Sequence, residues 1–142
     1  VSLPILLLMI QSEFDNIKLV SLIGVILSLL GIAIESIADY QMTKFKDKTN
    51  NKGKLMNKGL WQYSRHPNYF GDSMFWWGIF LFSYGYTSNL LIAISPILMT
   101  YFLIKVSGVS LLERQIKHKK EGYEEYIKNT SSFILMPNKN KK

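Results

Sequence analysis

Long apolar runs separated by short polar segments dominate this sequence. The runs cover residues 1–10, 17–38, 70–86 and 90–106, and within them the apolar positions are continuous rather than spaced at a period of two or 3.6. The run 17–38 is about as long as a bilayer is thick, since a spanning helix needs roughly 20 residues. With 142 residues, the chain is long enough for one domain. The pattern predicts an all-α fold: a polytopic bundle of transmembrane helices.

Small and acidic residues share one face of the helix expected over 17–38. Gly24, Ser28, Gly31, Glu35 and Asp39 follow one another at intervals of four, three, four and four, which places them on one side of a helix. Small side chains allow two helices to approach closely in lipid. We therefore expect this face to pack against another helix and to become acidic at its end.

Basic residues are concentrated in two polar segments. All but one of the seventeen lie in the stretch 40–65 or in the tail from Lys105 onward. By the positive-inside rule, the loop 40–64 and the tail 107–142 should be cytoplasmic. Membrane topology thus explains the net charge of +7, and we expect a lipid bilayer and no nucleic acid as partner. In a bacterium, this would be the inner (cytoplasmic) membrane.

The two ends of the chain have different characters. Residues 1–10 are apolar but too short to span a bilayer, and they lack the basic region of a signal peptide. We interpret them as the remnant of an upstream transmembrane helix, in a chain whose earlier helices are missing. The tail should form two cytoplasmic helices, over about 110–120 and 123–129.

Several kinds of chemistry find no support in the composition. Cysteine is absent, and His66 and His118 are the two histidines, so we expect no metal site. Neither a G-x-G-x-x-G fingerprint nor a P-loop is present. A dinucleotide would therefore be held by helix ends and loops at the membrane face.

The segment 59–72, GLWQYSRHPNYFGD, is the densest group of polar functional side chains. Pro67 suits the first position of a helix, with Ser64 or His66 near the N-cap. The positive end of that helix beside Arg65 favours an anion such as a phosphate, which arginine binds through paired hydrogen bonds. Alternatively, Arg65 anchors the helix at the lipid headgroups.

This segment resembles the signature of the steroid 5-alpha-reductase superfamily, and most closely its bacterial branch of uncharacterised membrane proteins. The stretches ESIADYQMTKFK (35–46) and 107–137 resemble the same branch. Together the three blocks cover most of the chain after about Gly24. A shorter core, Arg-His-Pro-x-Tyr-x-Gly, is similar to that of isoprenylcysteine carboxyl methyltransferases, which are related in fold.

The resemblance implies that the chain is the C-terminal, cofactor-binding part of a membrane-bound NADPH-dependent oxidoreductase. Such an enzyme reduces a carbon–carbon double bond of a hydrophobic, steroid-like or isoprenoid substrate. Hydride passes to the β-carbon of a polarised alkene, and protonation follows. No residue of this sequence is identified as the proton donor. The alternatives are an S-adenosylmethionine-dependent methyltransferase of a lipid-soluble acceptor and a membrane protein without catalytic activity.

The cofactor site expected from the motif and the resemblance has alternative explanations for several members. Asn68 and Asp72 could instead bond local backbone at the helix start, and Asp39 could form a salt bridge between helices. Ser110 and Glu113 also match a helix capping box. The expected cofactor-binding residues are Asp39, Arg65, His66, Asn68, Tyr69, Asp72, Glu113, Arg114 and Tyr126.

Overall fold

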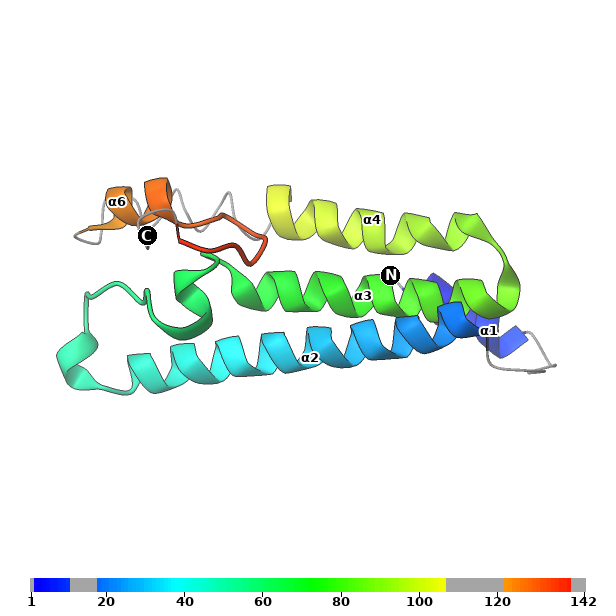
Figure 1. Ribbon diagram of the computed structural model, residues 1–142, viewed down its shortest axis with the longest axis horizontal. Coiled ribbons are helices and arrows are strands. Elements are labelled where there is room, and N and C mark those ends of the chain that lie inside the picture. Colours follow the sequence, from blue (N-terminus) through cyan, green and yellow to red (C-terminus); the bar gives the residue numbers. More distant parts are fainter. Residues whose placement is uncertain (1, 11–17, 107–121, 139–142) are drawn as a thin grey trace.

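The computed structural model describes residues 2–10, 18–106 and 122–138, and its regular elements are helical (Figure 1). The expected all-α fold is confirmed for this part of the chain. The elements are α1 (Leu3–Ile10), α2 (Leu19–Lys46), α3 (Pro67–Thr87), α4 (Ile94–Tyr101) and α6 (Tyr123–Asn129), the 3₁₀ turns η1 (Thr49–Asn51), η2 (Gly59–Gln62) and η3 (Leu90–Ala93), and the π-helical turn η4 (Phe102–Val106).

Helices α2 and α3 pack against each other with their backbones in contact. A Cβ atom added to Gly31 would lie 2.5 Å from the Phe75 nitrogen, and one added to Gly71 would lie 2.6 Å from the Glu35 nitrogen. Only glycine permits so close an approach, because any side chain would overlap the opposite backbone. The small-residue face expected on α2 is confirmed as the contact surface.

A repeat of seven residues fixes the register of this antiparallel pair. On α2, Ser21 and Ser28 are seven apart and lie against Gly85 and Gly78 of α3, which are also seven apart. The Ser21 hydroxyl donates to the Phe82 carbonyl at 3.1 Å, so the buried serine is hydrogen-bonded. Matching intervals keep small residues opposite each other along the whole contact, as in a heptad seam.

Helix α4 packs on the side of α3 that is opposite α2 (Figure 1). The Thr100 hydroxyl pairs with the Ser73 hydroxyl at 2.8 Å and accepts from Trp77 Nε1 at 3.2 Å. Pro96 lies in the first turn of α4, where a proline costs no intrahelical hydrogen bond. The helix type changes before it, between η3 and α4.

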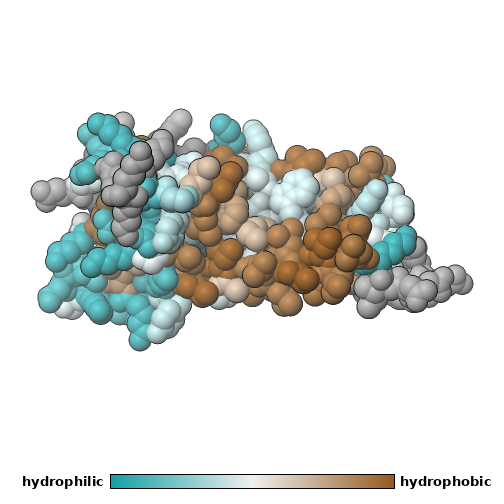
Figure 2. All heavy atoms as spheres, in the orientation of Figure 1, coloured by the Kyte–Doolittle hydropathy of each residue, from teal (hydrophilic) through white to brown (hydrophobic). Residues whose placement is uncertain are grey.

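Among the described residues, α2 is the one helix long and apolar enough to cross a membrane. The segment Leu90–Val106 is apolar but shorter, and α3 carries too many polar positions. Membrane association thus has support from one helix, and the expected polytopic bundle is not confirmed. Figure 2 shows apolar residues around the middle of the bundle and hydrophilic residues gathered at the end that carries α6. The exposed large aliphatic side chains of α2 are Leu19, Val20, Leu22, Ile23, Val25, Ile26, Leu29, Leu30, Ile32 and Ile37.

Helix α2 continues to Lys46, beyond the end at Ala38 that the hydrophobic run predicted. The first part of the expected loop 40–64 is therefore helical. Hydropathy marks where the apolar run ends, whereas a helix ends where its backbone hydrogen bonds end. The break between the apolar runs 70–86 and 90–106 is also short, because α3 reaches Thr87 and Ser88 adopts a left-handed conformation with φ of 51°.

We expect Gly31→Val to lower the free energy of unfolding by roughly 1–3 kcal/mol, the usual cost of overpacking a close contact. The matched control is Ala33→Val, which introduces the same side chain on the exposed face of α2. Thermal unfolding in detergent measures both. Equal melting temperatures for the two variants would contradict the backbone contact between α2 and α3.

Candidate functional site

The loop after α2 folds back over the end of that helix. Ala38, Met56 and Trp61 form a buried cluster, and Trp61 Nε1 donates to the Ala38 carbonyl at 3.0 Å. The Leu60 nitrogen donates to Gln41 Oε1 at 2.9 Å. These contacts hold η2, and hence the segment leading into α3, against α2.

The C-terminal segment lies alongside the same loop. Ser64 and Ser131 form a parallel β-bridge, in which the backbone nitrogen of Arg65 donates to the Ser131 carbonyl at 2.8 Å. The Ser64 hydroxyl donates to the Phe133 carbonyl at 2.8 Å. Residues more than sixty positions apart are thus joined immediately before α3 begins.

Helix α6 spans Tyr123–Asn129, as the sequence predicted, and two side chains fasten it to the loop. Arg65 Nη1 donates to the Ile127 carbonyl at 2.8 Å. The Tyr126 hydroxyl donates to the Trp61 carbonyl and lies 3.4 Å from the Ser64 carbonyl. Arg65 therefore bonds to protein backbone in addition to any role toward a ligand or a lipid headgroup.

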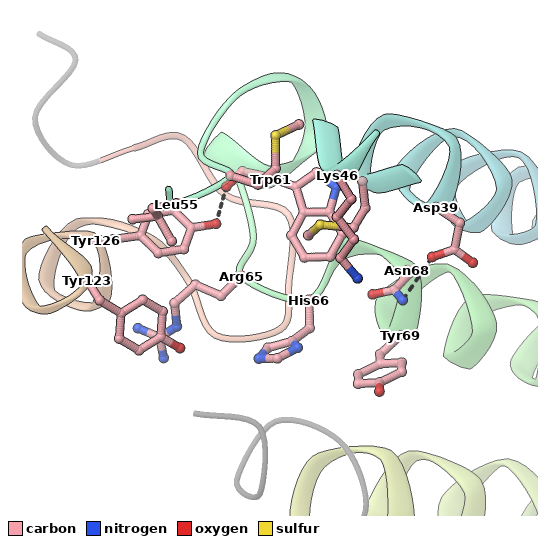
Figure 3. Close-up of a pocket in the computed structure, with 12 residues that line it drawn as sticks. Asp39, Lys46, Leu55, Trp61, Arg65, His66, Asn68, Tyr69, Tyr123 and Tyr126 are labelled. Atoms are coloured by element: carbon pink, nitrogen blue, oxygen red, sulfur yellow. Dashed lines mark hydrogen bonds between the residues drawn. The ribbon is translucent and has the colours of Figure 1, made fainter. Parts of the chain in front are cut away.

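A pocket of about 320 Å³ opens between α2, α3, the loop and α6. Figure 3 shows its side chains converging from these four elements. Apolar and aromatic residues form part of the wall, and charged and amide groups form the rest. The lining residues are Asp39, Met42, Lys46, Leu55, Met56, Trp61, Arg65, His66, Asn68, Tyr69, Tyr123 and Tyr126.

Asn68 is oriented by Asp39 across the helix pair. Its Nδ2 donates to Asp39 Oδ1 at 3.0 Å (Figure 3). Its Oδ1 is buried and has no hydrogen-bond partner within the described ranges. An acceptor left without a donor is costly in the interior. A ligand that brought an N–H or O–H group to this oxygen would remove that cost.

The start of α3 presents two rings to the pocket. Pro67 is the first helical residue and His66 is the N-cap, in agreement with the sequence. The backbone nitrogen of His66 donates to the Ser64 hydroxyl at 3.1 Å, which fixes the chain just before the helix. The rings of His66 and Tyr69 are stacked, with centroids 5.6 Å apart and planes 2° from parallel. Such a pair can form a flat wall for an aromatic ligand group.

Among the described residues, two basic side chains and one carboxylate line the pocket. Lys46 and Arg65 line it from α2 and from the segment before α3, and Asp39 lines it from α2 at the polar end of the α2–α3 contact. This mixture suits a ligand with an anionic part and hydrogen-bonding donors elsewhere, because lysine and arginine both bind phosphate oxygens.

Most of the residues expected from the sequence meet at this pocket: Asp39, Arg65, His66, Asn68, Tyr69 and Tyr126. Asp72 does not line it. One turn further along α3, Asp72 interacts with Trp76 and lies within electrostatic range of Glu35. Glu113 and Arg114 lie outside the described residues, as does the helix expected over 110–120.

Sequence reasoning missed several walls of the pocket, Lys46 above all. The sequence pattern places Lys46 in the basic loop 40–64, whereas in the structure Lys46 belongs to the last turn of α2. Asp39, Met42 and Lys46 stand at intervals of three and four, so they share a helical face. The signal was present and became visible only once α2 was known to continue. Leu55, Met56 and Trp61 had no such periodic signal.

A family model described as "Protein of unknown function (DUF1295)" matches residues 1–130 of the chain. No curated protein and no solved structure matches it. The match covers both the pocket and the helices that build it.

We expect Tyr126→Phe to release α6 from the loop, because it removes the hydroxyl that donates to the buried Trp61 carbonyl. The loss of local stability should be roughly 1–3 kcal/mol, the cost of leaving a buried acceptor unsatisfied. Amide hydrogen exchange over 123–136 measures it. Tyr63→Phe is the control, since that side chain is 40% exposed. Unchanged protection in Tyr126→Phe would show that the hydroxyl does not hold α6.

Proposed function

The chain belongs to the DUF1295 family, and we propose that it is the cofactor-binding part of a membrane-bound, NADPH-dependent oxidoreductase. Its substrate is a hydrophobic, steroid-like or isoprenoid molecule with a carbon–carbon double bond. The resemblance of residues 59–72, 35–46 and 107–137 to steroid 5-alpha-reductases and their bacterial relatives suggests the reaction. The structure adds a pocket at the place where two of these segments meet.

The observation that carries the proposal is the convergence at the pocket. Asp39 comes from the segment 35–46. The segment 59–72 contributes Arg65, His66, Asn68 and Tyr69. These segments are separated by a folded loop, and nothing in helix packing alone requires their polar side chains to share a cavity. A shared ligand explains why they do.

Each group has a role toward the cofactor. Arg65 and Lys46 neutralise phosphate charge, and the Asp39–Asn68 pair presents a fixed amide whose Oδ1 accepts a hydrogen bond from the ligand. His66 and Tyr69 offer a flat surface for a ring. When bound, NADPH supplies the hydride, while this chain binds and orients it. A volume of about 320 Å³ is at the lower end for ligand pockets, so it would enclose part of a dinucleotide.

The membrane explains how a hydrophobic substrate arrives. The exposed apolar face of α2 lies in the bilayer in this proposal, and the pocket lies at the polar end of the bundle. The basic loop and the C-terminus are then cytoplasmic, where NADPH is present. In a bacterium the membrane is the inner one.

Calorimetric titration of the detergent-purified full-length protein tests the proposal. Selective binding of NADPH is the expected result, with weaker binding of NADH because the 2′-phosphate is a contact. Selective binding of S-adenosylmethionine would replace the reductase by the methyltransferase, which shares the Arg-His-Pro-x-Tyr-x-Gly core. Binding of neither by folded protein would leave a membrane protein without this chemistry.

Arg65→Ala and Asn68→Ala should each weaken NADPH binding by roughly 1–3 kcal/mol, the range for losing a charge-assisted or buried hydrogen bond. Lys128→Ala is the matched control, because it removes a cation from the exposed side of α6 and does not line the pocket. Calorimetry measures all three variants, and hydrogen exchange over 123–136 separates a lost contact from an undocked α6. Wild-type affinity in both Arg65→Ala and Asn68→Ala would remove the site assignment.

A further inference from the structure

A second hollow, of about 410 Å³, lies beside the first pocket at the end of α2. It is formed by the last turn of α2 together with η1 and the turn after it. It shares Met42 and Lys46 with the first pocket and is otherwise lined by different residues. The described residues that line it are Met42, Phe45, Lys46, Asp47, Thr49, Asn51, Lys52, Gly53 and Lys54.

Hydrogen bonds fix the shape of this hollow. Asn51 Nδ2 donates to the Phe45 carbonyl at 2.9 Å, which ties the loop to the end of α2. The Lys52 nitrogen donates to the Thr49 carbonyl at 3.1 Å, and the Lys54 nitrogen donates to the Asn51 carbonyl at 2.9 Å. These bonds hold the backbone that carries Lys52 and Lys54 at the rim.

Gly53 leaves the hollow open between the two lysines. Its φ is 80°, and a Cβ atom added there would meet nothing within 4 Å. The turn needs a residue that tolerates positive φ, and the space beside it is free of protein atoms. A ligand can therefore approach the backbone between Lys52 and Lys54.

The described lining of the hollow combines an excess of positive charge with apolar side chains. Lys46, Lys52 and Lys54 face one acid, Asp47, and Met42 and Phe45 supply the apolar part. Lysine carries a compact positive charge at the end of a flexible side chain and commonly binds phosphate. The chemistry that fits is a phosphate group attached to an apolar body.

The position of the hollow along α2 indicates that the phosphate belongs to a phospholipid. The apolar stretch of α2 ends near Ala38, and Lys46 lies roughly 12 Å further along at 1.5 Å per residue. Headgroups occupy the layer directly outside the hydrocarbon core, and lysine side chains reach back toward that layer. Basic clusters placed there are attracted to anionic lipids.

We propose that this hollow is a binding site for the headgroup phosphate of an anionic phospholipid. Lys46, Lys52 and Lys54 bind the phosphate, and Met42 and Phe45 contact the first apolar atoms below it. The site shares Lys46 and Met42 with the first pocket, but Lys52 and Lys54 line this hollow and not the first pocket. The proposal therefore stands whether or not the chain is a reductase.

Lysines of the same loop provide a matched test. The variant Lys52→Gln/Lys54→Gln removes two charges from the hollow, and Lys48→Gln/Lys58→Gln removes two exposed charges that do not line it. Native mass spectrometry of the detergent-purified full-length protein, titrated with phosphatidylglycerol or phosphatidylcholine, gives the Kd for each. We expect tighter binding of phosphatidylglycerol. Lys52→Gln/Lys54→Gln should raise its Kd about 30-fold, roughly fivefold per lysine.

The other outcomes overturn the proposal. An equal rise in Kd for the two double variants means diffuse attraction of the loop to anionic lipid, and no rise in either means that the hollow is not used. Competition by inorganic phosphate at the same affinity means a site for free phosphate. Thermal unfolding of each variant checks that the fold is retained. NADPH titration of Lys52→Gln/Lys54→Gln keeps this test distinct from that of the proposed function, because neither lysine lines the first pocket.

Discussion

The direct contact between the backbones of α2 and α3 determines where everything else lies. Gly31 and Gly71 each meet backbone of the opposite helix, so the two helices cannot slide without a clash. The seven-residue intervals fix a single register, and that register continues to the polar end of the pair, where it places Asp39 opposite Asn68. A packing constraint inside the apolar part of the bundle thereby positions the polar pair of the candidate site.

The pocket is completed by contacts over long sequence distances. The loop covers the end of α2 through Trp61, and the C-terminal segment closes over the loop through the Ser64–Ser131 bridge and Arg65. Side chains with candidate roles toward a ligand, such as Arg65 and Tyr126, also hold this assembly together. A ligand that contacted Arg65 or Tyr126 would therefore also affect the docking of α6, because the same groups hold α6 to the loop.

The two hollows divide the positive charge of the loop between different environments. Lys46 lines both. Lys52 and Lys54 line only the second hollow, at the end of α2, and Arg65 lines only the first pocket, here called the inner pocket. The inner pocket combines cations with a carboxylate, an amide and aromatic rings, which suits a ligand with several kinds of polar group. The second hollow combines lysines with apolar side chains. In the proposed membrane placement it lies near the lipid headgroups, which suits a headgroup phosphate.

The sequence by itself determined the helical fold, the small-residue face of α2, the start of α3 at Pro67 and the bounds of α6, because these depend on local patterning and on proline geometry. It also placed most of the polar residues of the pocket, since they lie in one dense segment. Only the tertiary structure decided that α2 continues to Lys46 and that Trp61 and Met56 form a wall. It also decided that Asp72 does not line the pocket and that Arg65 bonds to the Ile127 carbonyl. Those features depend on contacts between distant segments, for which a single sequence carries no periodic signal.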